Sequence, residues 1–163
     1  MKKFVALYFL FLALLFTFFY ADTSIVSTAV NRGQTNLTLD LLALFLKPGQ
    51  VQGIDIWIDP HYRIYISQAC NGFIPIFFVW AAILAYPAKK YHKLLWIFVS
   101  YVVFTAVNVL RLLMVVYFVE QEGGRANFHW SHDLLGNALL MAAGLGLFIV
   151  FIKTASRSPS PPQ

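Results

Sequence analysis

The sequence predicts an all-α polytopic membrane protein with about four transmembrane helices and a small outer loop. Of its 163 residues, 60% are hydrophobic and 12% are charged, which is far from the averages of soluble globular domains. Four apolar runs approach the roughly 20 residues that a helix needs to cross the hydrocarbon layer. They cover residues 4–20, 72–87, 94–119 and 134–152. The Lys and Arg residues adjoin these runs, so membrane topology explains the net charge of +5 better than nucleic-acid binding does.

The first apolar run follows Met1, Lys2 and Lys3, so it has to be distinguished from a cleaved secretory signal. It is long for a signal, and bulky Phe19 stands where a small residue should precede cleavage after Ala21. We therefore expect a retained membrane anchor.

The charged residues predict the orientation, because Lys and Arg accumulate in cytoplasmic segments. With the N-terminus inside, the inner segments contain Lys2, Lys3, Lys89, Lys90, Lys93, Lys153 and Arg157, and the outer segments contain Arg32, Lys47, Arg63 and Arg125. The carboxylates all fall outside or at the outer boundary: Asp22, Asp40, Asp55, Asp59, Glu120, Glu122 and Asp133. Both termini are thus predicted to be cytoplasmic.

The outer loop, residues 21–70, contains two predicted elements. The segment LTLDLLALFLKPG has a short helical apolar pattern that ends at Pro48-Gly49 and is too short to span, so it predicts an interfacial helix. The segment GIDIWIDPHYRIYIS alternates isoleucines with other residues around Asp59-Pro60, which predicts a β-hairpin. Residues 1–155 are expected to form one membrane-embedded domain, and the Ser/Pro-rich residues 156–163 a disordered cytoplasmic tail.

Cys70 is the only cysteine in the chain and lies at the outer start of the second span. A lone thiol has no partner in the chain for a disulfide, so it is either an inert small hydrophobe or a reactive group. The unpaired N–H groups and the dipole of a helix start favour a thiolate, and Asn71-Gly72 allows a sharp turn into the helix.

Arg111 lies inside the third span, where a guanidinium costs roughly 2.5–3.5 kcal/mol at mid-membrane. About 1.5 Å per residue from Leu94 puts it near 26 Å along the helix, in the outer leaflet. Asn108, three residues earlier, shares its helical face and can hydrogen-bond it. The alternative is an Arg that only anchors the helix by snorkelling, but its inset position and its Asn neighbour favour a functional role.

The segment NFHWSHDLLGNALL opens the fourth span and contains His129, His132 and Asp133. We expect His132 to begin the helix and His129 to be an interfacial loop residue. A metal site remains a minor possibility, because only His61 and aspartates of the outer loop could complete the ligand shell. Cys70, Arg111 and His132 thus come from three spans but lie near the same outer end, where a thiol, a base and a fixed cation permit nucleophilic catalysis.

These motifs resemble the exosortase/archaeosortase family of membrane-embedded cysteine transpeptidases. The resemblance rests on ACNGF with Cys70, NVLR with Asn108 and Arg111, and HDLLG with His132, and it covers about residues 62–140. It implies that Cys70, Arg111 and His132 are catalytic, with Asn108 supporting Arg111. The chain is similar to the compact, four-span forms that keep the catalytic core.

The resemblance also implies a function, without a metal or another cofactor. Such enzymes act at the outer face of the prokaryotic cytoplasmic (inner) membrane. They cleave C-terminal sorting signals, each made of a short motif, a transmembrane helix and a basic tail, from tail-anchored surface proteins. The reaction proceeds through a thioester acyl-enzyme, and transpeptidation and hydrolysis share every step up to it, so the sequence leaves the acceptor open.

Three alternatives remain. The chain could be a non-catalytic membrane module that binds a partner membrane protein, with Cys70 inert. An intramembrane protease of another type is disfavoured, because no Ser/His pair on adjacent spans and no paired intramembrane Asp is present. A thiol redox protein is disfavoured because the chain lacks a second, resolving cysteine.

Overall fold

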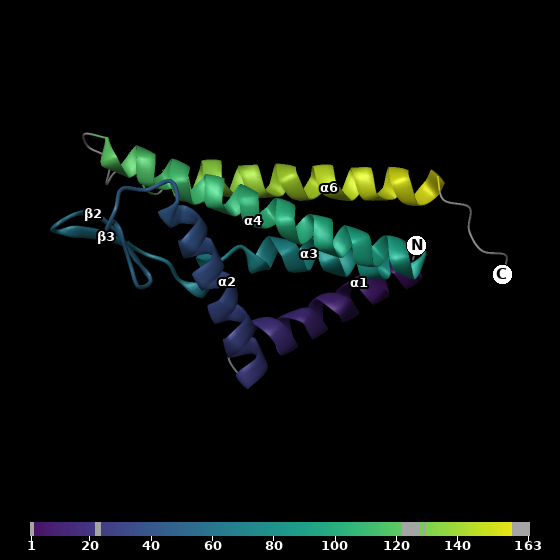
Figure 1. Cartoon of the computed structure of the whole chain (residues 1–163). Helices are drawn as coiled ribbons and strands as arrows, with labels where there is room; N and C mark the ends of the chain where they lie inside the picture. The colour runs from purple at the N-terminus through teal and green to yellow at the C-terminus, as the bar shows by residue number, and fades with distance from the viewer. Residues whose placement is uncertain (1, 22–23, 122–127, 129, 158–163) are drawn as a thin grey trace.

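The computed structural model is mostly helical and describes residues 2–21, 24–121, 128 and 130–157. Helices α3, α4 and α6 run beside one another, with a small β-sheet near one end of this bundle (Figure 1). The start of α1 and the end of α6 lie at the opposite end (Figure 1). The main helices are α1 (Lys2–Leu15), α2 (Ile25–Ala43), α3 (Phe73–Ala85), α4 (Lys90–Glu120) and α6 (Asn137–Arg157).

The helices match the predicted all-α membrane architecture. Within the described part of the chain, three segments are long and apolar enough to cross a membrane: Lys2–Tyr20, Lys90–Glu120 and Leu134–Ser156. The first is α1 continued by a π-helical turn, η1 (Phe16–Tyr20). The third begins at Leu134, within the π-helical turn η3 (Trp130–Gly136) that leads into α6. The second predicted span corresponds to α3, a shorter apolar helix.

Helix α3 is short because both of its ends are fixed by local sequence. Gly72 precedes it with φ +86°, in the left-handed region that favours glycine. Tyr86 follows it in an extended conformation, which is the conformation favoured before a proline such as Pro87. Helix α3 therefore has only 13 residues.

Helix α2 is longer than the predicted interfacial helix and begins well before it. Ser24 caps the helix, because its hydroxyl accepts a hydrogen bond from the N–H of Ser27 at 3.0 Å. The helix reaches Ala43, and turns then lead to the predicted stop at Pro48-Gly49. It descends from the sheet end and meets the end of α1, so the two helices form a V (Figure 1). The sequence pattern missed its first half because the buried face there is polar.

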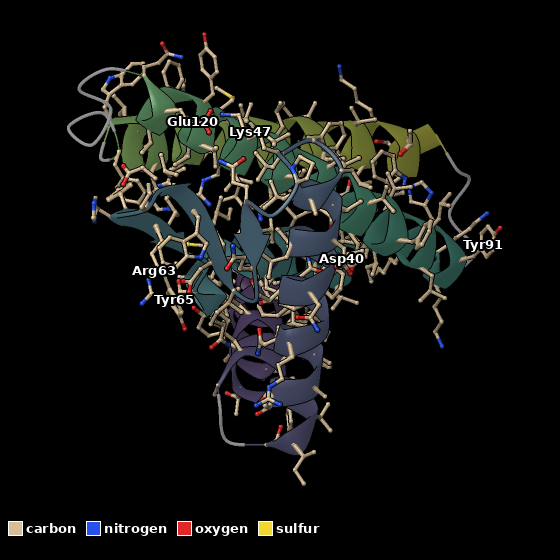
Figure 2. All side chains as sticks on the ribbon, turned by 60° about the vertical axis from the view of Figure 1, so that its left-hand side comes forward. Asp40, Lys47, Arg63, Tyr65, Tyr91 and Glu120 are labelled. Carbon is tan, nitrogen blue, oxygen red and sulfur yellow. The ribbon has the colours of Figure 1, made fainter. Side chains whose placement is uncertain are left out.

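The predicted β-hairpin is confirmed and gains a third strand. The antiparallel sheet has the order β1 (Val51–Gln52), β2 (Asp55–Asp59) and β3 (Tyr62–Tyr65). Ile56 pairs with Ile64, and both are buried. Arg63 and Tyr65 alternate with them and point away from the molecule (Figure 2). The hairpin thus has the one buried face that the alternating sequence predicts.

Two hydrophobic clusters lie at different levels of the molecule. The sheet-end core joins α2, the sheet and the second half of α4: Leu39, Leu42, Ile56, Ile64, Ile66, Val109, Leu112, Val115, Val116 and Val119. The bundle core joins α3, α4 and α6: Phe73, Ile76, Phe77, Val79, Ile83, Phe104, Leu140 and Phe151. At the surface, Lys47 bonds Glu120 at 3.3 Å (Figure 2), which ties the loop after α2 to the end of α4. The sequence-predicted site lies where the two cores meet.

Candidate active site

Cys70 lies on a tight turn between β3 and α3. Residues Gln68–Cys70 form one turn of 3-10 helix, η2, and the N–H of Cys70 donates to the carbonyl of Ser67 at 2.9 Å. The side-chain oxygen of Asn71 accepts the N–H of Phe73 at 3.0 Å, so it satisfies a donor at the start of α3. The turn holds the thiol half-buried, with its Sγ 3.5 Å from the Ser67 hydroxyl.

Asn108 and Arg111 lie on one buried face of α4, as their spacing predicts. Arg111 is only 4% exposed, and its Nη1 donates to the Asn108 side-chain oxygen at 3.4 Å. The Asn108 amide nitrogen in turn donates to the carbonyl of Cys70 at 2.9 Å. A single amide side chain therefore links the guanidinium to the main chain of the cysteine.

Two glycines allow close approach to α4, one from the turn that carries Cys70 and one from η3. A Cβ added at Gly72 would lie 3.1 Å from Cγ of Asn108. A Cβ added at Gly136 would lie 2.6 Å from Nε of Arg111, a distance that real Cβ contacts essentially never show. The glycines of the ACNGF and HDLLG motifs thus give Asn108 and Arg111 their space.

His132 reaches the site from η3. Its ring stacks on that of Phe128, with 5.1 Å between the centroids and 12° between the planes. Its Nε2 lies 2.9 Å from Nη2 of Arg111 and 3.9 Å from Sγ of Cys70. The structure therefore brings together all four residues, Cys70, Arg111, His132 and Asn108, that the sequence suggested from three separate segments.

The thiol is acidified by its neighbours. Burial raises the pKa of Cys70, but hydrogen bonds with His132 and Ser67, together with the charge of a protonated His132, outweigh burial and lower the pKa to about 7. About half of the thiol is then ionised at neutral pH. The helix start was expected to favour the thiolate, whereas the contacts that lower the pKa are those with His132 and Ser67.

Sequence reasoning missed some polar groups around the cysteine. Ser67 lies three residues before Cys70, in the sequence SQAC, and its hydroxyl contacts the thiol. Asn31 and Gln34 of α2 contact Asn71. Their signal was the recurrence of polar residues at Ser27, Asn31, Gln34 and Thr38, which is helical spacing within a segment that we had treated as part of a loop.

The remaining sequence suggestions concern a metal and His129. Among the side chains that the structure describes, no three of His, Cys, Asp and Glu cluster so that they could hold a metal ion. His129 lies outside the described residues, as do Asp22, Glu122, Arg125 and the end of the chain from residue 158. Ser156 and Arg157, the first two residues of the predicted tail 156–163, belong to α6.

Comparison with known families identifies the class of protein. The model of the transmembrane exosortase family matches residues 2–149. This match covers most of the 163 residues, so the chain belongs to the transmembrane exosortase family. Neither a curated protein nor a solved structure matches the chain significantly.

Proposed function

We propose that this membrane protein is a cysteine transpeptidase or peptidase that cleaves C-terminal sorting signals of surface proteins. The observation that carries the proposal is a cluster in which one acidified thiol and one buried guanidinium each lie within hydrogen-bonding reach of the same imidazole. Family membership supports a transpeptidase-type role. The substrates we propose are tail-anchored proteins with a short motif, a transmembrane helix and a basic tail.

In the first step, the Cys70 thiolate attacks the carbonyl carbon of a peptide bond just outside the substrate's transmembrane helix. A C–S bond forms, and the carbonyl oxygen becomes an oxyanion. When the tetrahedral intermediate collapses, its C–N bond breaks and the departing amine takes a proton from His132. The products of this step are a thioester on Cys70 and the released C-terminal signal.

The division of roles between Arg111 and His132 follows from a competition for one nitrogen atom. A guanidinium only donates hydrogen bonds, so the 2.9 Å contact requires Nε2 of His132 to accept from Arg111. The hydrogen bond that acidifies Cys70 requires the same Nε2 to carry a proton. The two contacts therefore alternate: Nε2 accepts from Arg111, which is always a donor, while the thiol is neutral, and Nε2 carries the proton and donates to Sγ once the thiolate has formed. Transfer of the thiol proton to His132 then requires Nη2 of Arg111 to move away.

A substrate carbonyl is the acceptor toward which Arg111 would move. Its oxygen gains negative charge as Cys70 attacks, so the hydrogen bond from the guanidinium strengthens toward the transition state. Asn108 keeps its hydrogen bonds with both Arg111 and Cys70, which limits that movement. We therefore assign oxyanion stabilisation to Arg111, proton transfer to His132 and support of both partners to Asn108.

In the second step, an amine or water attacks the thioester after His132 removes a proton from it. The C–S bond breaks, and the thiolate of Cys70 is restored. An amine acceptor gives transpeptidation, and water gives hydrolysis.

We further propose that residues 1–155 form one catalytic domain in the prokaryotic cytoplasmic membrane, with both termini cytoplasmic and the site at the outer face. Lysines at the predicted inner ends of the spans support this orientation: Lys2, Lys3, Lys89, Lys90, Lys93 and Lys153. The start of α1 and the end of α6 lie opposite the sheet (Figure 1), which fits a site that is reached from outside. A substrate helix anchored in the same membrane would present its motif beside Cys70.

The proposal is tested by the processing of a surface protein from the same cell that ends in a transmembrane helix and a basic tail. Wild type is compared with Cys70→Ala, Arg111→Ala and His132→Ala, each at equal membrane abundance. We expect loss of processing in all three variants.

Full processing by Cys70→Ala would overturn the thiol mechanism. The alternative, a non-catalytic module that binds a partner membrane protein, predicts that outcome, because Cys70 is inert in it.

A further inference from the structure

Helix α2 turns a polar face toward the interior of the protein. Ser27, Asn31, Gln34 and Thr38 are separated by four, three and four residues, so they share one side of the helix. All four are buried. A buried amide is costly unless its hydrogen bonds are made, so the partners of Asn31 and Gln34 indicate what this face is for.

Both amides bind Asn71, the residue that follows the candidate nucleophile. The Gln34 side-chain nitrogen donates to the main-chain carbonyl of Asn71 at 3.2 Å. The Asn31 side-chain oxygen accepts from the Asn71 side-chain nitrogen at 3.3 Å. Asn71 is fully buried. It is therefore held at its main chain and at its side chain by two residues of α2.

Other hydrogen bonds fix the two amides themselves. The Tyr101 hydroxyl donates to the Gln34 side-chain oxygen at 2.7 Å, and Gln34 also donates to Thr105 at 3.3 Å. The Asn31 nitrogen donates to the carbonyls of Phe19 at 2.9 Å and Ser27 at 2.8 Å. These bonds restrict the rotamers of both amides, so each can place Asn71 without a large loss of side-chain entropy.

The carbonyls of two consecutive residues are thus held from two helices. Asn108 of α4 donates a hydrogen bond to the carbonyl of Cys70 at 2.9 Å, and Gln34 of α2 donates one to the carbonyl of Asn71. With both peptide groups fixed, the turn has little freedom to rotate, and its rotation would carry Sγ of Cys70 away from His132. Precise placement of this kind contributes strongly to catalysis, because small displacements of reacting groups lower rates severely.

We propose that Asn31 and Gln34 are positioning residues, which hold the Cys70-Asn71 turn so that the thiol faces His132. This inference rests on the function proposed above, and it gives the outer-loop helix α2 a role in catalysis. Neither side chain contacts the thiol itself in any hydrogen bond that the described structure contains. They act through Asn71.

The test is alkylation of the full-length protein in membranes with a small neutral reagent over a range of pH. Cys70 is the only cysteine, so all labelling reports on it. Among the described side chains, the charged or titratable groups placed against the thiol are His132 and, behind it, Arg111. The pH at which the labelling rate of Cys70 is half of its maximum is the midpoint. In Asn31→Leu and Gln34→Met, we expect this midpoint to rise by about one pH unit and the labelling rate at pH 7 to fall about fivefold. Processing should lose kcat with little change in KM.

Thr38→Val is the matched control. Thr38 lies on the same buried face of α2, but its hydroxyl has no hydrogen-bond partner among the described residues. Its removal leaves the contacts of Asn71 intact, so the labelling profile should stay at the wild-type midpoint. Tyr101→Phe is a milder variant, which removes one hydrogen bond from Gln34 and should shift the midpoint in the same direction by less.

Wild-type midpoints in Asn31→Leu, Gln34→Met and Tyr101→Phe would overturn the positioning role, as would an equal shift in Thr38→Val. If Gln34→Met does not accumulate, Tyr101→Phe decides the outcome. The labelling needs no substrate, so its result is independent of whether the wild-type protein processes sorting signals. Failure of the proposed function would appear as absent processing with the labelling pattern unchanged.

Discussion

The two ends of the helix bundle each hold a histidine in an aromatic contact, but the partners of the two rings differ. His132 stacks on Phe128 at 5.1 Å, and its Nε2 meets Arg111 and Cys70. His92 stacks on Phe151 at 5.4 Å, and its Nε2 lies 3.3 Å from the Thr154 hydroxyl. Stacking thus orients both rings, and the polar partners decide which ring can take part in chemistry.

The packing around the two histidines differs in the same way. Phe151, beside His92, is fully buried and also contacts Tyr86 and Trp96 through ring edges. At the sheet end, buried amides hold the turn of the cysteine. Aromatic packing joins helices at one end, whereas costly buried polar groups are concentrated at the other. Buried polar groups persist where their hydrogen bonds are made, and here they surround the candidate nucleophile.

The largest expected difference is between two separate substitutions, one at each histidine. His132→Gln removes the general acid and base, so we expect processing to fall about 10²–10⁴-fold in kcat/KM. His92→Gln should leave processing within about threefold, since its ring contacts neither Cys70 nor Arg111 in the structure. Processing rates at equal membrane abundance compare the two. Similar losses in both variants would remove the functional distinction between the two ends.

A smaller effect is expected from an added methyl group at either of two glycines near the fourth span. In Gly136→Ala the new Cβ would collide with Arg111, so the guanidinium must move, and we expect a loss on the order of 10²-fold in kcat. Gly146→Ala has no described atom within 4 Å of its new Cβ. It should keep full activity and gain about 0.5–1 kcal/mol of helix stability. A fully active Gly136→Ala would show that the position of Arg111 is unimportant.

The next effect concerns the pH dependence of the thiol. The pKa of Cys70 is lowered to about 7, so the thiolate fraction decreases as the pH falls through 7. Alkylation of wild type should slow about fivefold between pH 7 and pH 6. His132→Gln removes a group that stabilises the thiolate, so its midpoint should rise toward about 8.5. A midpoint that does not respond to this change would mean that His132 does not act on Cys70.

The smallest effect is expected at the surface of the sheet end. Lys47 forms its ion pair with Glu120 while its side chain is 77% exposed. Exposed pairs contribute about 0–1 kcal/mol. Lys47→Ala should therefore change the unfolding free energy by less than about 1 kcal/mol, and the alkylation midpoint should stay unchanged. A shift of that midpoint would show that the surface of this end is coupled to the site.

Hydropathy was sufficient to predict the three helices that are long enough to cross a membrane and the shorter apolar helix α3, because lipid-facing helices need apolar side chains over their whole length. Alternating isoleucines predicted the hairpin, since one of its faces is buried. The half of α2 that carries Asn31 could not be predicted in this way. Its buried face bonds to other buried polar groups, so its pattern resembles that of a solvated loop.

The site was predictable as a set of residues but not as a geometry. Cys70, Arg111 and His132 stand out because a lone thiol, an intramembrane cation and a histidine at a span's end are unusual in such surroundings. Their hydrogen bonds depend on how three segments pack around Gly72 and Gly136. Those distances are set by tertiary contacts, which no local pattern contains.

The most direct test of the account is intact-mass analysis of the protein after incubation with a sorting-signal substrate. Acid quenching of the wild-type reaction at short times should capture the intermediate before the second step releases it. We expect an adduct with the mass of the substrate's N-terminal part, attached to Cys70 and released by hydroxylamine, as thioesters are. Processing that continues in Cys70→Ala, or an adduct attached to any other residue, would contradict the assignment of Cys70 as the nucleophile.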